Sequence, residues 1–375
     1  MNAATDASGT PAVADAVLLV SRPEATDPRW PLARVAGLPA VERTLMTLHS
    51  LGVQRVRVVC GVREFATVAA HFGARRPDRR LPLVEVVPLA PCAPTAIDAG
   101  VVRPAPALRA QLAGASPDAL RRLGYAEDVT SPQGRRRAER AILQSLRQPN
   151  DGWFARTIDR SVSLAISRRL APLPLTPNAV TLGTMVVGLA AGLLACLGTY
   201  PGFVGAGALF LLASVLDGVD GEIARMKFQQ SDGGQWLDTV CDDLANVVYL
   251  AGVTVGSWRA FASPWLLQAG VAAVILDVAT VSLMYWQLLT RLNARSLHAF
   301  EEKIAGPGFR ANAFVRLLVR LAGSIKRDFY APAFLLFALC GAAWIALPAT
   351  AVALTVTLGF LLWDLARDAA AARRA

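Results

Sequence analysis

The chain is poor in the residues that build disulfide bonds and thiolate or imidazole metal sites. Its 375 residues include 3 histidines, which lie far apart, and 5 cysteines, which are Cys60, Cys92, Cys196, Cys241 and Cys340. None of the cysteines has CxxC spacing, so the sequence indicates neither disulfide bonds nor a zinc site. The amino terminus also lacks a basic leader followed by an apolar core, so we expect no cleaved signal peptide.

Charge is scarce as well. Only 18% of the residues are charged, 54% are hydrophobic and the mean hydropathy is +0.41, which is too apolar for a water-soluble protein of this length. Residues 170–216 carry no charged side chain and are interrupted by a Gly/Pro segment at 198–202. Because a membrane span needs about 20 apolar residues, this stretch predicts two spans. We expect four more, the third from the second aspartate pair to Trp258, the fourth over 264–289, and a fifth and sixth within 329–363, divided at Pro348.

The net charge of +10 is carried by basic residues beside these spans. They lie at Arg168 and Arg169 before the first span, in residues 291–327 between the fourth and fifth, and at Arg373 and Arg374. The positive-inside rule therefore predicts a multi-pass protein of the inner cell membrane with both termini in the cytoplasm. Nucleic-acid binding is disfavoured, because aromatic residues do not interleave with the basic ones.

The polar amino-terminal part predicts a small α/β domain. Residues 1–14 are small and polar, which is typical of a disordered tail. Within a domain of residues 15–100, buried-strand runs at 16–20, 55–60 and 83–87 alternate with helical periodicity at 40–51 and 64–72, a pattern for a parallel sheet. Residues 101–149 predict a linker with short helices, one capped at 116–118 and one over 134–146, and residues 151–170 an amphipathic interfacial helix.

The main candidate site is a set of four aspartates beside the membrane. They follow the pattern D-x2-D-G-x2-A-R-x8-G-x3-D-x3-D, which begins at Asp217 and ends at Asp242. Asp217 and Asp220 are separated by one helical turn, as are Asp238 and Asp242, so each pair lies on one helix face. Carboxylate oxygens are the ligands of hard cations such as Mg2+ and Mn2+, and unpaired buried charges are costly. The pattern therefore predicts a site for two divalent ions.

This motif resembles the signature of the CDP-alcohol phosphatidyltransferase family at every specified position, and the resemblance covers residues 150–370. It implies an integral membrane enzyme that moves a phosphatidyl or phosphoalcohol group from a CDP-linked donor to an acceptor alcohol and releases CMP. Asp217, Asp220 and Asp238 would be metal ligands, and Asp242 would share a metal or act as general base. The residues expected to contact the substrate nucleotide or its phosphates are Gly221, Ala224, Arg225, Gly234, Asn178 and Thr181.

Several residues have alternative interpretations. Small residues in membrane helices commonly serve helix packing, and acids beside spans can line an ion pathway, so a cation transporter is the rival interpretation of the aspartates. Asp243 points about 100° away from Asp242 on a helix, and Asp232 lies in the loop, so neither is expected to be a ligand. Asp277 lies in the middle of the fourth span and is a functional candidate or a buried hydrogen-bonding group. Lys326 and Arg327 could bind an acceptor phosphate or only anchor the helix.

Residues 31–61 resemble the early part of a sugar-phosphate nucleotidyltransferase domain. The glycine-rich phosphate loop of those enzymes is replaced by SRPEATDPR, and Leu38 stands where they have a lysine. We therefore expect a degenerate domain that serves docking or dimerisation. The layout is nevertheless similar to the bifunctional inositol-1-phosphate cytidylyltransferase and CDP-inositol inositolphosphotransferase group, so the donor is expected to be CDP-diacylglycerol or CDP-inositol-like, with a phospholipid or inositol phosphate as product. An active cytidylyltransferase domain and a non-catalytic membrane scaffold are the alternatives; family likeness implies a homodimer.

Overall fold

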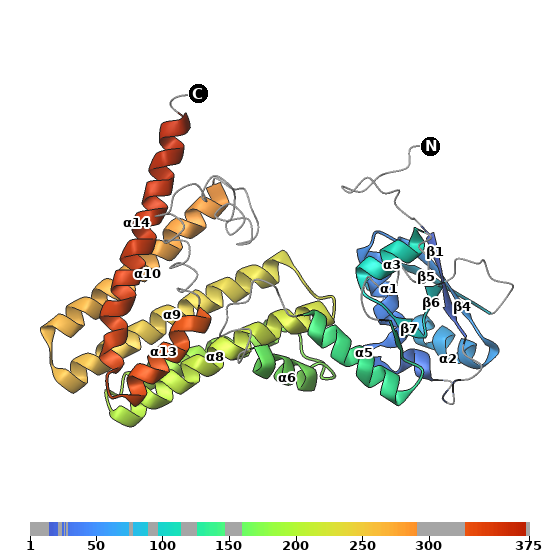
Figure 1. Ribbon diagram of the computed structural model, residues 1–375, viewed down its shortest axis with the longest axis horizontal. Coiled ribbons are helices and arrows are strands. Elements are labelled where there is room, and N and C mark those ends of the chain that lie inside the picture. The colour runs from blue at the N-terminus through green and yellow to red at the C-terminus, as the bar shows by residue number, and fades with distance from the viewer. Residues whose placement is uncertain are drawn as a thin grey trace. The chain divides into compact units, whose positions relative to one another are not determined.

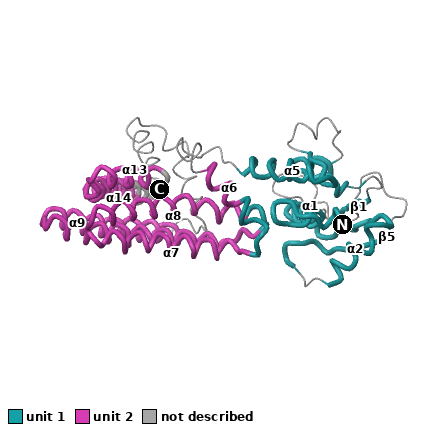
Figure 2. Tube along the Cα trace, turned by 90° about the horizontal axis from the view of Figure 1, so that it is seen from below, with its two compact units in different colours: residues 1–148, 168–174, 225–228 teal, residues 149–167, 175–224, 229–375 magenta. Residues whose placement is uncertain are grey.

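The computed structural model divides the chain into two units (Figure 2). It describes residues 15–372 except 22–24, 26, 28, 75–77, 89–96, 114–125, 147–159 and 291–326. Unit 1 contains residues 1–148 together with two short stretches of the later chain, 168–174 and 225–228. Unit 2 contains residues 149–167, 175–224 and 229–375. The predicted disordered tail at 1–14, the helix capped at 116–118 and residues 151–159 of the predicted interfacial helix lie outside the described residues.

Unit 1 contains a parallel sheet of four strands in the order β5-β4-β1-β6. The strands are β1 (Asp15–Val20), β4 (Arg55–Cys60), β5 (Leu83–Pro88) and β6 (Ile97–Asp98), and β1 pairs with β4 in the register Asp15 with Arg55. The crossover helices are α1 (Ala40–Ser50) and α2 (Val62–Gly73) (Figure 1). Alternating side chains of β1 and β4 are fully buried, such as Leu18 and Val58, and they pack in a core with Leu45 of α1. The predicted β-α-β-α-β order of this region is confirmed.

Shorter elements complete unit 1. A 3-10 turn η1 (Trp30–Leu32) leads into the two-residue strands β2 (Arg34–Val35) and β3 (Leu38–Pro39), which pair with each other. Strands β7 (Val101–Val102) and β8 (Glu127–Asp128) also form an antiparallel pair, as β2 and β3 do. Helix α3 (Ala105–Leu112) lies between them in sequence. Helix α5 (Pro132–Ser145) begins where Ser131 accepts a hydrogen bond from the Gly134 amide, in agreement with the predicted helix over 134–146.

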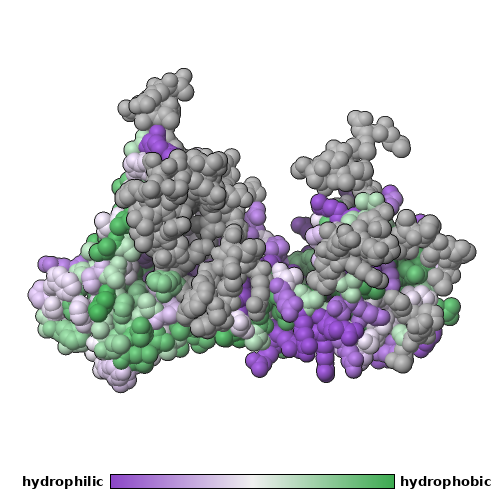
Figure 3. Space-filling model, in the orientation of Figure 1, coloured by the Kyte–Doolittle hydropathy of each residue, from purple (hydrophilic) through white to green (hydrophobic). Residues whose placement is uncertain are grey.

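Unit 2 is helical. Its helices are α6 (Arg160–Leu170), α7 (Pro177–Ala195), α8 (Tyr200–Met226), α9 (Asp232–Phe261), α10 (Pro264–Thr290), α13 (Arg327–Leu339) and α14 (Ala346–Ala372), with η3 (Ala343–Ile345) before the last. Helices α7, α8, α10 and α14 are long and apolar enough to cross a membrane. Hydrophobic side chains cover much of the described surface of unit 2 on the face shown in Figure 3. The predicted multi-pass helical fold preceded by an α/β region is therefore confirmed.

The six predicted spans correspond to six helices of unequal character. Helix α9 has 30 residues but begins with the polar aspartate segment, and α13 has 13 residues, fewer than the roughly 20 that a full span needs. The predicted division at Pro348 was wrong. The chain turns at Gly341, whose φ of +70° suits glycine, and Pro348 lies in the first turn of α14. Proline fits a first helical turn because the amide hydrogen that it lacks has no helical partner there.

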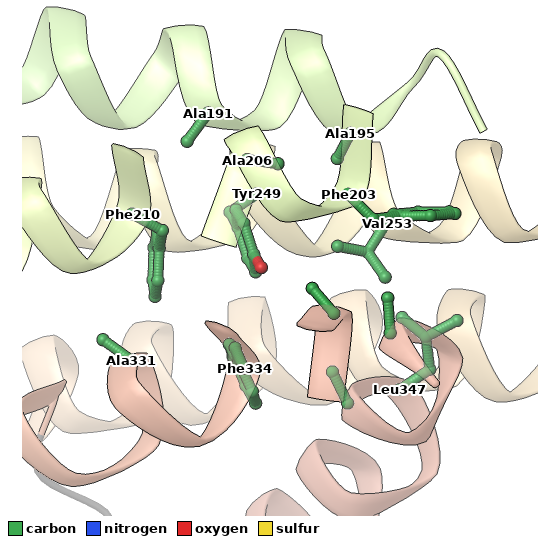
Figure 4. Close-up of a cluster of buried hydrophobic side chains, with 13 residues drawn as sticks. Ala191, Ala195, Phe203, Ala206, Phe210, Tyr249, Val253, Ala331, Phe334 and Leu347 are labelled. Atoms are coloured by element: carbon green, nitrogen blue, oxygen red, sulfur yellow. The ribbon is translucent and has the colours of Figure 1, made fainter. Parts of the chain in front are cut away.

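Close helix packing brings the candidate site together. A Cβ added to Gly252 of α9 would lie 2.1 Å from the carbonyl oxygen of Gly192 on α7, so these two helices touch through backbone atoms. One helical turn before Gly252, Tyr249 stacks on Phe210 of α8 with ring centroids 4.0 Å apart. Figure 4 shows this aromatic pair facing Phe334 of α13 within the buried cluster. The packing holds α8 and α9 in register just beyond the four aspartates.

Candidate active site

The four aspartates come from two helices joined by a short connection. Asp217 and Asp220 lie in the carboxy-terminal half of α8, while Asp238 and Asp242 lie in the amino-terminal half of α9. Helix α9 begins sharply because Ser231 caps it and accepts a hydrogen bond of 3.0 Å from the Gly234 amide. The one-turn spacing within each pair turns both carboxylates of a helix to one face.

Three of these carboxylates converge. One oxygen each of Asp217, Asp238 and Asp242 can be chosen so that all three lie within 4.8 Å of one another. Asp220 adjoins this group, because its carboxylate and those of Asp238 and Asp242 are close enough to influence one another electrostatically. The structure thus brings all four predicted ligands to one place.

Asp220 is the most buried member, with 5% of its surface exposed. Its Oδ2 accepts a hydrogen bond from the hydroxyl of Thr181 on α7, and its Oδ1 accepts one from the Gly221 amide. Thr181 is itself buried and anchored to the Pro177 carbonyl oxygen at 3.3 Å. Thr181 was predicted to contact the nucleotide; its observed contact orients the Asp220 carboxylate.

The residues present fit a divalent metal centre. The donors are all oxygens, as Mg2+ and Mn2+ prefer. Four neighbouring carboxylates repel one another when ionised, and Arg327 is the cationic partner that the described residues show for them. Divalent cations between the pairs would compensate this charge, and the carboxylate oxygens could then act as ligands instead of sharing protons.

Arg327, at the start of α13, closes one side of the cluster. Its Nη1 donates to Oδ1 of Asp242, and its guanidinium carbon lies 5.3 Å from the centre of the Phe210 ring. The side chain is only 9% exposed, yet Nε and Nη2 have no hydrogen-bond partner among the described residues. Two buried donors of a fixed cation are thus left for an anionic ligand. Lys326, predicted to act with Arg327, lies outside the described residues.

The start of α7 meets the start of α9. A Cβ on Gly234 would lie 3.0 Å from the Ser231 hydroxyl oxygen and 3.3 Å from Oδ1 of Asn178, so glycine allows Asn178 to approach the α9 terminus. Thr176 caps α7 by accepting a 3.3 Å hydrogen bond from the Ala179 amide. Asn178 is exposed between these two helix starts, whose amide groups favour anions.

The remaining motif residues lie where the spacing places them. Gly221 and Ala224 are half-buried on α8 between Asp220 and Arg225, and Arg225 lies in the last turn of that helix. The placement of Asp232 in the loop was wrong, because Ser231 caps α9 and Asp232 is its first residue, where an acidic side chain complements the helix dipole. Asp243 accepts a hydrogen bond from the Tyr285 hydroxyl on α10, so it is held apart from the converging carboxylates.

A largely apolar cavity of about 300 Å³ lies one helical turn beyond Asp242. Its wall comes from α8, α9, α10, α13 and α14, and includes Asn246 and Asp277. Oδ1 of Asn246 and Oδ2 of Asp277 are buried and have no hydrogen-bond partner among the residues that the structure describes. Asp277 therefore lines this cavity, and its Oδ2 does not show the buried hydrogen bond that was one of its two interpretations.

Sequence reasoning missed Glu222, which occupies a variable position of the motif. This side chain is fully buried and accepts hydrogen bonds from Arg160 Nη1 at 3.0 Å, Ser163 at 2.7 Å and Ser167 at 2.6 Å, all from α6. Glu222 thereby joins α6 to the back of the helix that carries Asp217 and Asp220. The repeat of serines at i and i+4 on α6 was the available signal, because it places two hydroxyls on one face.

A family model for the CDP-alcohol phosphatidyltransferases matches residues 174–366, just over half of the 375 residues. The chain belongs to the CDP-alcohol phosphatidyltransferase family. The matched range runs from the start of α7 into α14 and contains the whole aspartate motif. The resemblance inferred from that motif is therefore confirmed.

Two of the curated relatives that the chain matches have two-part names. The chain is 30% identical over 157 residues to a "Bifunctional IPC transferase and DIPP synthase" of Aquifex aeolicus, covering 41% of this chain and 35% of the relative. It is 37% identical over 131 residues to a protein of the same name from Rubrobacter xylanophilus, covering 35% and 29%. The matches thus span about a third of each relative. Among solved structures, Mycobacterium tuberculosis phosphatidylinositol phosphate synthase, in complex with manganese and citrate, matches with a TM-score of 0.35 and 19% identity, over 53% of this chain and 87% of that one.

Proposed function

We propose that this protein is a membrane CDP-alcohol phosphotransferase, which transfers a substituted phosphate from a CDP-linked donor to an acceptor hydroxyl and releases CMP. The observation that carries the proposal is the convergence of the aspartates of α8 and α9 in a chain whose family is established. A cation transporter would not require Arg225 and three small residues at these spacings. Two divalent ions, Mg2+ or Mn2+, would supply positive charge for the bridging phosphates of the donor.

Each carboxylate has a proposed role. Asp217, Asp220 and Asp238 hold the ions, and Thr181 keeps the Asp220 carboxylate in one orientation. Asp242 takes the proton of the acceptor hydroxyl as general base and also contributes to metal binding. It suits this role because one of its oxygens is oriented by Arg327 and its side chain is 25% exposed, so that an acceptor can reach it.

The donor is proposed to lie between the starts of α7 and α9. Gly221, Ala224 and Gly234 leave room for a nucleotide beside the helix backbone. Asn178 is exposed there and can donate its amide hydrogens to the nucleotide, while Arg225 would contact a donor phosphate. The cytidine and its pyrophosphate would thus occupy the side of the site formed by α7 and the end of α8.

The acceptor is proposed to lie on the α13 side. The two free donors of Arg327 point to recognition of an acceptor phosphate, because guanidinium pairs with phosphate through two parallel hydrogen bonds. Since Nη1 of the same side chain contacts Asp242, a bound phosphate would position the acceptor hydroxyl beside the base. An inositol-phosphate-type acceptor satisfies this arrangement, and the names of the curated relatives favour inositol chemistry.

The location and assembly of the protein are proposed from its charge pattern and family likeness. We propose an inner-membrane protein with both termini and the aspartates on the cytoplasmic side, and a homodimer formed through the membrane helices. Unit 1 is proposed to be a degenerate nucleotidyltransferase domain that makes no CDP-alcohol. The bifunctional alternative predicts pyrophosphate release from CTP and inositol phosphate by the full chain, and we expect none.

The deciding assay is CMP release by the purified full-length protein in detergent or liposomes. CDP-diacylglycerol and CDP-inositol would each be supplied with inositol, inositol phosphate or glycerol phosphate, with Mg2+ or Mn2+. We expect one donor and acceptor pair to give metal-dependent CMP release coupled to product formation. Absence of CMP release from every pair, in protein shown to be folded, would exclude the phosphotransferase for these donors and favour the scaffold interpretation.

A further inference from the structure

Unit 1 includes two short connections between helices from the later part of the chain, which are called corners below. The first, the α6–α7 corner, is residues 168–174, and the second, the α8–α9 corner, is residues 225–228. The turn between β2 and β3 touches the first corner at Gly37, whose φ is +84°. A Cβ at Gly37 would lie 2.2 Å from the carbonyl oxygen of Ala171, so only glycine allows this contact. Arg34 adds a 2.8 Å hydrogen bond to the carbonyl oxygen of Pro172.

Arg43 of α1 reaches the second corner. Its side chain is buried, and it donates to the carbonyl oxygens of Val35 at 3.1 Å and Ala36 at 3.0 Å, both in or beside the same β2–β3 turn. Its Nη2 also donates to the carbonyl oxygen of Met226 at 2.8 Å, and its guanidinium lies 5.8 Å from the Phe228 ring centre. Met226 is the last residue of α8, where carbonyl groups lack helical partners and a cation is favourable.

The two corners are also tied to each other within unit 1. Lys227 donates from Nζ to the carbonyl oxygen of Leu173 at 2.7 Å, and Arg80 donates to the carbonyl oxygen of Lys227 at 3.0 Å. The bonds from Arg34, Arg43, Arg80 and Lys227 to the corners all end on backbone carbonyl groups. They therefore hold the path of the chain, and Lys227 is the only corner side chain that takes part in them. Arginine forks and a buried lysine make such a connection stiff.

These corners lead directly into the proposed donor site. Residue 174 is followed by Thr176 and Asn178 at the start of α7, and the second corner begins with Arg225 itself. A small displacement of a binding group can cost about 100-fold in rate, because binding and catalysis depend on exact placement. A unit that clamps both corners therefore controls how Asn178 and Arg225 are presented to a nucleotide.

We propose that the α/β unit is a positioning module for phosphotransfer, in which Gly37 and Arg43 clamp the two corners and thereby set the donor-binding groups. The inference rests on the proposed function. It assigns a role to a domain that resembles a nucleotidyltransferase but lacks the glycine-rich loop and the lysine of those enzymes. Gly37 and Arg43 are positioning residues, since neither touches a substrate. The proposal predicts that loosening the clamp raises the KM for the CDP-linked donor and leaves the KM for the acceptor and the metal requirement unchanged.

The test compares two glycine variants of the full-length protein. Gly37→Ala introduces the Cβ that collides with Ala171. Gly52→Ala is the matched control, because Gly52 has a similar φ of +90° but nothing within 4 Å of its added Cβ. Both variants strain a turn of unit 1, and only the first disturbs a corner. We expect Gly37→Ala to lower kcat/KM for the donor by about 10-fold to 100-fold, and Gly52→Ala to stay within about twofold of wild type.

A second pair of variants addresses folding. Arg43→Lys keeps the positive charge but cannot reach three carbonyl groups, and Arg57→Lys, at an exposed ion pair on β4, is its control. Hydrogen exchange is measured on all variants. With Arg43→Lys we expect faster exchange of the Phe228 and Gln229 amides, which bond to Arg225 and Ala224. The amides of β1 and β4 should remain as protected as in wild type.

The outcomes separate this inference from the proposed function. If wild-type protein releases no CMP, the proposed function fails, and the exchange experiment alone still tests the clamp. If wild type is active and Gly37→Ala behaves like Gly52→Ala, the positioning role is refuted. It is equally refuted if the variants lose protection throughout β1 and β4, or if kcat falls while both KM values stay at their wild-type values, because those results describe a loss of folded protein.

Discussion

Glu222 offers a test of how helix α6 is attached to the site. The carboxylate is 0% exposed and its partner Arg160 is 13% exposed, so Glu222→Gln removes one charge from a buried ion pair. Removing one partner of such a pair costs about 3–5 kcal/mol, because the other charge stays buried. Glutamine keeps one acceptor oxygen for the serine hydroxyls, so we expect the lower end, about 3 kcal/mol.

Thermal unfolding of the purified protein in detergent measures this loss. A change of 1 kcal/mol shifts Tm by about 2–4 °C in a domain of 150–250 residues, so Glu222→Gln should lower Tm by roughly 6–12 °C. Glu139→Gln is the control, since the Glu139 pair with Arg168 spans 3.7 Å and is partly exposed at 24% and 47%. Exposed pairs contribute about 0.2–1 kcal/mol.

The reasoning would be refuted if Glu222→Gln lowered Tm no more than Glu139→Gln. A double variant that also carries Arg160→Gln gives an independent check. Because it removes both members of the ion pair, it should be less destabilised than the sum of the two single variants. Strict additivity would mean that Arg160 and Glu222 do not interact in the folded protein.

Three further predictions concern the metal and acceptor groups. Thr181→Val removes the hydroxyl that bonds Asp220 and should weaken Mn2+ activation by about 10-fold to 100-fold, while Thr181→Ser should restore it; a Mn2+ titration of CMP release distinguishes them. Arg327→Lys should raise the KM for a phosphorylated acceptor by about 10-fold or more with little change in donor KM, and equal effects on both substrates would contradict the acceptor assignment. Chelation by EDTA should abolish CMP release and lower Tm. Both CMP release and Tm should recover when Mn2+ is added back, but not when the chelator is removed without added metal.

The elements that sequence predicted well are those encoded by nearby residues. The strands of unit 1 show as short apolar runs, and the aspartate motif shows as helical spacing within two segments on either side of one connection. Both signals are local, so the amino-acid sequence alone assigns Asp217 and Asp242 to a common site. The small residues Gly192 and Gly252 gave no such signal, although their contact sets the approach of α7 and α9.

The contacts that sequence could not predict join residues far apart in the chain. The bond between Arg327 and Asp242 spans 85 residues, and that between Thr181 and Asp220 spans 39. Glu222 bonds to Ser163 across 59 residues. None of these pairs lies in one pattern of periodicity, because each depends on how separate helices pack. For the same reason Pro348 was a poor guide to the end of a span, since proline is compatible with both a break and a helix start.

The most direct test of the central claim is metal-dependent CMP release by three purified proteins: wild type, Asp217→Asn and Asp243→Asn. Asp217 belongs to the converging carboxylates, whereas the neighbouring Asp243 is held by Tyr285 outside them. We predict that Asp217→Asn loses CMP release by at least about 1,000-fold at any Mg2+ or Mn2+ concentration, as expected when a ligand of a charge-stabilising site is removed. Asp243→Asn should keep activity within about tenfold of wild type. Full CMP release by Asp217→Asn, or release by wild type that survives complete removal of divalent metal, would contradict the account.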